Sequence, residues 1–168
     1  MPVATSGDGV MPSRVLAVFI LAVLIAVTPV AAARAADDPA GLLLSLINRY
    51  RAASGLTPLA SDATLDEVAR RHGEDMATRA FFAHVTPEGG GLGDRLWNAG
   101  YRFTIAAENL ARGYRDAKAV LAGWQGSPGH QANLLRNDVS AAGIGIAAAA
   151  GPDRQPVWVL VLARPQPN

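Results

Sequence analysis

The chain has 168 residues with 15 basic and 14 acidic side chains, a formal net charge of +1, and no cysteine. This charge balance gives no basic surplus that could hold nucleic acid by releasing counterions from phosphates, so we expect no nucleic-acid partner. Without cysteine the chain forms no disulfide, and a folded domain must be stabilised by core packing alone.

The N-terminal segment has the pattern of a secretory signal peptide. Arg14 precedes an apolar run over 15–30, which ends in the small residues Ala33-Arg34-Ala35. A basic residue, a short apolar stretch and an A-x-A site predict cleavage near Ala35. The run is also shorter than the roughly 20 residues of a spanning helix. We therefore expect a signal peptide over 1–35, with Met11 as an alternative start.

Cleavage at this site would deliver the protein to the periplasm or the cell exterior. The alternative is an uncleaved segment that anchors the protein, which would be its only link to a membrane. The rest of the chain, 36–168, is long enough for a single domain with one core. Removal of Arg14, Arg34 and Asp8 leaves this domain formally neutral.

Two amphipathic helices open the domain. Asp38 and Pro39 are typical of an N-cap and a first helical position, and apolar periodicity continues over 42–53. A second helix is predicted from Ser61-Asp62 to about Phe81. Its apolar face comprises Leu65, Val68, Ala69, His72, Met76 and Ala80.

The second half of the chain mixes short helices with strands. The pattern predicts a loop over 87–93, a helical turn over 94–98, a strand over 101–105, helices over 116–125 and from 127, and strands over 142–150 and 156–163. The last two strands flank the turn sequence G-P-D-R-Q and should form a hairpin. The final strand is apolar on both faces, as in a central strand covered by helices on each side. The fold class is therefore α+β, in three layers.

Three short segments each place one ionisable side chain in an apolar or glycine-rich frame. They are F-F-A-H at 81–84, A-A-E-N-L-A at 106–111 and G-S-P-G-H-Q-A-N-L-L at 126–135. Two of the three histidines of the chain lie in these segments, and a glutamate lies between them in sequence. Two imidazoles and one carboxylate are the groups that ligate a metal ion or that donate and accept protons in an acid/base site.

This ordered set resembles the CAP superfamily of cysteine-rich secretory proteins, antigen 5 and plant pathogenesis-related proteins, in particular its cysteine-free bacterial branch. Further matching pieces are I-N-R-Y-R at 47–51, the L-x-x-x-A-x-x-H-x-x-x-M spacing at 65–76, W-Q at 124–125 and A-G-I-G-I at 142–146. The resemblance implies a three-layer α-β-α sandwich of the CAP type with a small, mostly antiparallel central sheet. It also implies a central cleft lined by His84, Glu108 and His130.

If these three side chains converge, their nitrogen and oxygen ligands suit a divalent metal such as zinc, with a fourth position left to water. Imidazole also binds copper and nickel. Without a metal, a carboxylate near two imidazoles favours their charged forms and allows proton transfer. The plain alternative is that all three are buried polar groups satisfied by local hydrogen bonds. Many animal and plant members have a second glutamate at the position of Ser127, so its absence here weakens a two-carboxylate mechanism.

Several other polar residues receive supporting roles. We expect Asn109 and Asn133 to tie loops to backbone near the cleft. Ser127 is interpreted as the N-cap of the last short helix, which Pro128 would begin. Arg51 is expected to close a hydrogen-bond network under the first helix. His72, on the apolar face of the second helix, is interpreted as a packing histidine rather than a ligand.

Two classes of function remain open. The favoured one is an exported binding module whose cleft holds a lipid, a glycan or a protein partner of the cell envelope. The missing second carboxylate and the absence of a conventional nucleophile motif such as G-x-S-x-G favour this class. The alternative is a metal-dependent or acid/base hydrolase that acts on peptide or on an envelope polymer. We therefore assign no catalytic residue from the sequence.

Overall fold

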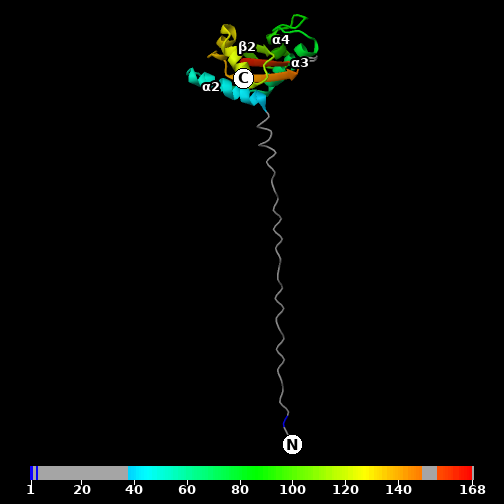
Figure 1. Ribbon diagram of the computed structural model, residues 1–168, viewed down its shortest axis with the longest axis vertical. Helices are drawn as coiled ribbons and strands as arrows, with labels where there is room; N and C mark the ends of the chain where they lie inside the picture. The colour runs from blue at the N-terminus through cyan, green and yellow to red at the C-terminus, as the bar shows by residue number, and fades with distance from the viewer. Residues whose placement is uncertain (2, 4–37, 149–154, 168) are drawn as a thin grey trace.

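The computed structural model describes residues 38–148 and 155–167, together with residues 1 and 3 (Figure 1). The predicted signal peptide therefore lies almost wholly outside the described residues, as does the turn at 149–154 between the last two strands. No helix in the described part of the chain is long and apolar enough to cross a membrane.

A four-stranded sheet in the order β1-β3-β4-β2 forms the middle of the molecule. The strands are β1 (Ala60–Ser61), β2 (Phe103–Arg112), β3 (Ala141–Ala148) and β4 (Pro156–Pro165). β4 pairs antiparallel with both β3 and β2, whereas β1 pairs parallel with β3. The prediction of a mostly antiparallel sheet is confirmed, and the apolar final strand is central.

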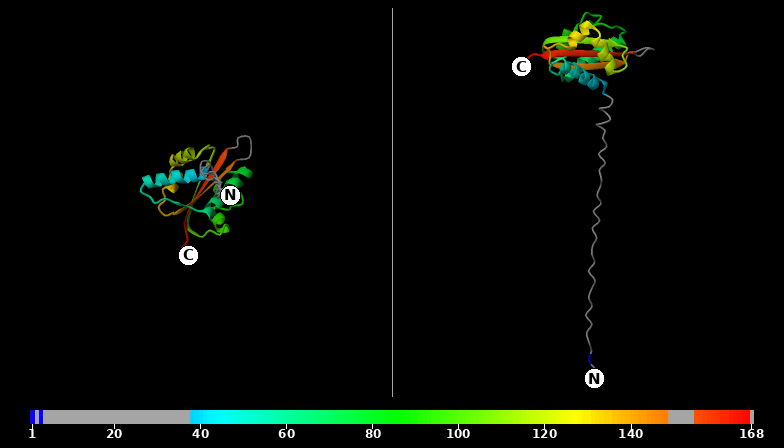
Figure 2. Two further views of the ribbon diagram at one scale, coloured as in Figure 1. Left: turned by 90° about the horizontal axis from the view of Figure 1, so that it is seen from below. Right: turned by 60° about the vertical axis from the view of Figure 1, so that its left-hand side comes forward.

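Helices cover both faces of this sheet (Figure 2). α3 (Ala63–Thr78) and α4 (Leu92–Asn98) pack on one face, and α2 (Pro39–Ala53), α5 (Ala117–Gln125) and α6 (Pro128–Leu134) pack on the other. Successive side chains of β4 point to opposite faces of the sheet, so they belong alternately to the two halves of the core. Val159 lies in the cluster with α3, and Leu160 lies in the cluster with α2 and α5. The α-β-α sandwich is confirmed.

Element boundaries differ from the predictions in three places. α3 ends at Thr78 rather than near Phe81, because Ala80 takes a left-handed φ of 58°. The amide of Phe81 then donates to the carbonyl of Met76, which closes a Schellman-type C-terminus without glycine. Ala80 is exposed and does not continue the apolar face. α4 begins at Leu92, inside the predicted loop, and β2 continues to Arg112, well past the predicted strand.

Two glycines of β3 let α3 lie directly on the sheet. A Cβ atom on Gly143 would overlap the backbone of Leu65 and Asp66, and one on Gly145 would overlap the backbone of Ala69 and Arg70. Backbone atoms cannot move aside without a shift of the whole helix. The A-G-I-G-I segment therefore sets the distance between α3 and the sheet, and with it the position of every side chain that α3 presents.

Replacement of Gly143 by alanine should destabilise the protein by about 1–3 kcal/mol or more, because a methyl group forced into a filled space costs this much. Urea unfolding of Gly143→Ala and wild type measures the difference. Gly129→Ala is the matched control, because a Cβ at that helical position meets nothing within 4 Å. An unchanged unfolding midpoint for Gly143→Ala would contradict this view of the interface.

Candidate functional site

The site is built around Glu108, in the second half of the edge strand β2. Glu108 is in register with Val161 on β4, so its side chain enters the layer that holds α3 and α4. The next residue, Asn109, is in register with Leu160 and faces the opposite layer. Only 3% of the Glu108 side chain is exposed. A carboxylate removed from water in this way requires charged or hydrogen-bonding partners.

Both oxygens of Glu108 have partners. Oε1 lies 2.8 Å from Nδ1 of His84, and Oε2 lies 2.6 Å from Nη2 of Arg95. His72 from α3 approaches more distantly, with its Nε2 4.0 Å from Oε1. Three segments therefore meet at one carboxylate, namely α3, α4 and the loop between them.

Arg95 also organises the loop that carries His84. Its Nη1 donates to the carbonyl oxygen of His84 at 2.9 Å and, at 3.5 Å, to that of Gly90. The side chain is only 13% exposed, so most of the guanidinium is removed from water together with Glu108. The sequence analysis did not identify Arg95. The one signal that could have pointed to it is the need for a cation near a glutamate in a buried strand.

His84 is the solvent-facing member of this group. Its side chain is 57% exposed, whereas its Nδ1 is held by the carboxylate of Glu108. An ionised carboxylate only accepts hydrogen bonds, so the proton of the imidazole is placed on Nδ1. A carboxylate in this position fixes the orientation of the ring and its tautomer. Nε2 of His84 is therefore the atom that the site offers to a ligand.

His72 is buried, as the helix pattern predicts. Its Nε2 lies 3.1 Å from the carbonyl oxygen of Ala83, and its Nδ1 has no hydrogen-bond partner among the described residues. Burial lowers the pKa of His72, and the opposing attraction of Glu108 is the smaller effect. His72 therefore stays neutral and supports the loop that precedes His84.

The structure shows less about His130, which lies on α6. The carbonyl oxygen of His130 accepts a hydrogen bond from Nδ2 of Asn109 at 3.0 Å. Burial, and then the charge of His84, lower the pKa of the His130 imidazole. No hydrogen bond joins the His130 ring to His84 or Glu108, and a cleft formed by all three side chains stays a prediction.

The supporting asparagines lie on the α6 side of β2. Asn109 is fully buried. Nδ2 of Asn133 donates to Oδ1 of Asn109 at 2.9 Å and to the carbonyl oxygen of Glu108 at 3.2 Å. Ser127 occupies the N-cap position of α6 before Pro128, but its side chain makes no capping hydrogen bond. The asparagines therefore attach α6 to the strand that carries Glu108.

Arg51 also holds backbone segments together, at a place away from the Glu108 cluster. This buried side chain of α2 donates to the carbonyl oxygens of Thr57, Leu134 and Arg136 at 3.1, 2.8 and 2.8 Å. It thereby joins the end of α2 to the end of α6. This is the network under the first helix that the sequence predicts, and it lies outside the Glu108 cluster.

As arranged, the donor set fits an ion pair rather than a metal centre. A cation bound to Glu108 would meet the guanidinium of Arg95, which already holds Oε2. Among residues 38–148 and 155–167, no three His, Asp or Glu side chains are placed to hold a metal ion together. A zinc ion shared by His84, Glu108 and His130 would therefore require Arg95 to move.

The sequence can now be placed among known proteins. The model of the cysteine-rich secretory protein family, CAP, matches residues 44–162. This match covers more than half of the chain, and the chain belongs to the CAP family.

Two relatives from Bacillus subtilis strain 168 are similar to it. The uncharacterized membrane protein YlbC is 39% identical over 104 residues, which are 62% of this chain and 30% of YlbC. The uncharacterized protein YkwD is 33% identical over 103 residues, which are 61% of this chain and 40% of YkwD. The chain therefore matches less than half the length of either curated relative.

Solved structures agree with the family. An extracellular protein of Bacillus anthracis that contains an SCP domain has a TM-score of 0.69 and 32% identity, over 75% of this chain and 40% of that one. An outer surface protein of Borrelia burgdorferi has a TM-score of 0.69 and 23% identity, over 75% and 92% of the two chains. The second likeness shows the fold alone.

The pair of Glu108 and Arg95 should be strongly coupled in stability. Arg95→Gln leaves a buried carboxylate without its cation, which typically costs about 3–5 kcal/mol. In Glu108→Gln/Arg95→Gln the charge is gone, so the double variant should be more stable than the sum of the two single changes implies, by about 0.5–3 kcal/mol. Urea unfolding of the four proteins measures this coupling.

Arg79→Gln is the matched control for this cycle. Arg79 pairs with Glu88, and the two side chains are 39% and 66% exposed. An exposed pair contributes at most about 1 kcal/mol. Additive effects of the changes at Glu108 and Arg95 would contradict the importance assigned to their pair.

His72 should make stability depend on pH. Its folded pKa is below the unfolded value of about 6.5, so the unfolded chain takes up the proton first and stability falls as pH falls below that value. His72→Gln removes this contribution. Its unfolding free energy should then fall less between about pH 7 and 5, by up to about 1.4 kcal/mol per pH unit. A wild-type pH dependence in the variant would show that His72 is not held neutral.

Proposed function

We propose that the chain is an exported binding module of the cell envelope or the extracellular space. In this proposal a signal peptide over 1–35 is removed near Ala35, and 36–168 acts as one CAP domain. The cleft formed by His84, Glu108 and His130 receives a lipid, a glycan or a protein partner.

The way in which Glu108 is held supports binding as the function. Its charge is already balanced by Arg95, and its second oxygen orients His84. The carboxylate is thus engaged in positioning, and the imidazole of His84 is presented to solvent with one nitrogen available. Phe82 and Val85, which flank His84, are 43% and 49% exposed. An oriented polar group between exposed apolar side chains is suited to recognition of a partner surface.

The relatives support the location. The Bacillus anthracis protein with 32% identity is described as extracellular, and YlbC is described as a membrane protein. Both descriptions fit a domain that works outside the cytoplasmic membrane. An uncleaved N-terminal segment would leave the same domain tethered there.

The alternative function, an acid/base hydrolase acting on peptide or envelope polymer, is favoured by the same contact of His84 with Glu108. A carboxylate that orients an imidazole is the arrangement of a general base. No serine or threonine hydroxyl hydrogen-bonds to His84 in the described part of the chain. Such an enzyme would therefore activate a water molecule directly.

A variant with both His84→Ala and His130→Ala separates a site from structural support. The full-length wild-type chain is first tested for binding to insoluble cell-wall polymer and to phosphatidylglycerol vesicles. We expect the double variant to lose binding to the material that binds wild type. Its thermal midpoint should move little, because truncation of the half-exposed His84 admits water to Oε1 of Glu108, while Arg95 keeps its hydrogen bond to Oε2. Loss of buried hydrogen bonds would instead cost about 1–3 kcal/mol each, or roughly 2–8 °C per kcal/mol.

The control is Arg115→Ala, which removes an exposed charge that takes no part in the Glu108 cluster. Retention of the double variant equal to that of wild type would contradict the binding proposal. Hydrolysis of casein or cell-wall polymer by wild type, and its loss in the double variant, would establish the hydrolase instead.

A further inference from the structure

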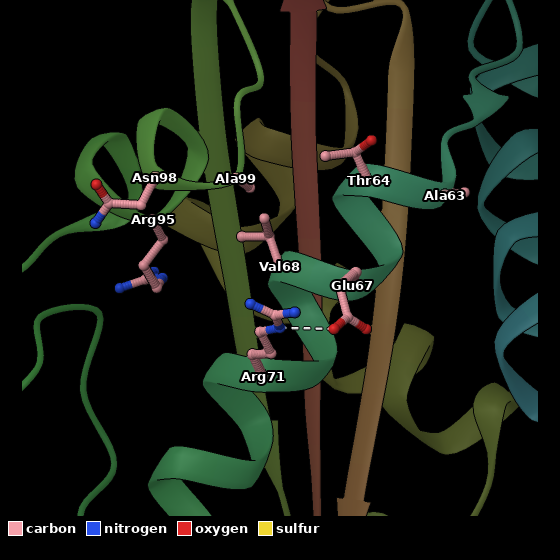
Figure 3. A pocket seen from close by; sticks show the side chains of 8 residues that line it. All are labelled: Ala63, Thr64, Glu67, Val68, Arg71, Arg95, Asn98 and Ala99. Carbon is pink, nitrogen blue, oxygen red and sulfur yellow. Dashed lines mark hydrogen bonds and ion pairs between the residues drawn. The ribbon is translucent and has the colours of Figure 1, made fainter.

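A cavity with a volume of about 490 Å³ lies between α3 and α4. One wall is formed by α3, with Ala63, Thr64, Glu67, Val68 and Arg71. The other is formed by Arg95 and Asn98 of α4 and by Ala99, which follows this helix. Figure 3 shows the two arginines on opposite walls, with the guanidinium of Arg71 beside the carboxylate of Glu67. This volume is within the range of small-ligand pockets, about 300–1,000 Å³.

The charged groups of the wall favour a single negative charge. Of the two guanidiniums in the lining, that of Arg95 is already paired with the carboxylate of Glu108, so the guanidinium of Arg71 is the cation that remains for a ligand. Glu67 is already held by Arg70 and Arg71, and hydrogen bonds from both lower its pKa to about 2. Arg71 uses only Nε for this contact, and its two terminal nitrogens have no partner within residues 38–148 and 155–167. A planar carboxylate suits such a guanidinium, and it carries one charge where a phosphate carries nearly two.

The uncharged groups indicate what accompanies that carboxylate. The apolar part of the lining is limited to Ala63, Val68 and Ala99, and so small an apolar surface matches a small apolar side chain. The hydroxyl of Thr64 and the amide of Asn98 provide hydrogen-bonding groups that peptide units use and an alkyl chain does not.

We propose that the cavity between α3 and α4 binds the free C-terminus of a peptide that ends in a small apolar residue. In this site the terminal carboxylate pairs with Arg71, the last side chain packs on Val68, and the polar wall meets the peptide amides. The site needs no contact with His84 or His130. It therefore stands or falls independently of the function proposed for the cleft.

The test uses N-acetyl-alanyl-alanine, with a free carboxylate, as the probe and the whole chain labelled with ¹⁵N. At millimolar concentration the probe should shift the backbone amide signals of 63–71 and 95–99. The same peptide with an amidated C-terminus should shift them little, because it lacks the negative charge. Arg71→Gln should bind the free peptide about two- to five-fold more weakly, because an ion pair on an exposed side chain contributes up to about 1 kcal/mol.

Arg71 suits this test because its side chain is 74% exposed and its removal leaves the core intact. Arg49→Gln, an exposed arginine of α2 on the other side of the sheet, is the matched control and should bind like wild type. The proposal is overturned if neither segment responds to the free peptide, or if the amidated peptide binds equally well. Binding of hexanoate in preference to the peptide would identify a fatty-acid site and would also overturn it.

Discussion

A buried negative charge on β2 determines how α3, α4 and the loop between them are assembled. The carboxylate of Glu108 is almost completely removed from water, and such a group is stable only with close cationic and hydrogen-bonding partners. Arg95 supplies the cation, and the same guanidinium holds the carbonyl oxygen of His84. The position of α4, the path of the loop after α3 and the orientation of the exposed imidazole therefore follow from one ion pair. A change in any of the three must alter the surroundings of the carboxylate.

The alternation of side chains along β2 connects this charge to the opposite layer. Glu108 and Asn109 are neighbours in sequence, but they face opposite sides of the sheet. Asn109 holds the carbonyl oxygen of His130, and Asn133 holds both Asn109 and the carbonyl oxygen of Glu108. Because β2 is an edge strand, that carbonyl would otherwise be available to another chain. Two consecutive residues thus fix the helices on both sides of the strand.

The sequence predicts the parts of this arrangement that depend on local patterns. Apolar periodicity identifies α2, α3 and α5, and the presence of apolar residues on both faces of the final strand identifies β4 as central. The two-residue strand β1 was not predicted, because its pairing with β3 is a long-range contact without a pattern of its own. Arg95 was missed for a related reason. Periodicity assigns a residue to a face of a helix, but it does not identify the charge that the residue will meet across the structure.

Arg95 belongs to two features at once, because it is the counter-ion of Glu108 and also a wall of the cavity between α3 and α4. Its replacement must therefore disturb the ion pair, the orientation of His84 and the cavity together, and a loss of ligand binding by that variant would not assign the ligand to one of the two sites. His84 and Arg71 do not share this ambiguity. Their side chains are 57% and 74% exposed, and they contact different carboxylates, those of Glu108 and Glu67. A ligand whose binding is weakened by replacement of His84 alone therefore lies at the Glu108 cluster. A ligand whose binding is weakened by replacement of Arg71 alone lies in the cavity between α3 and α4.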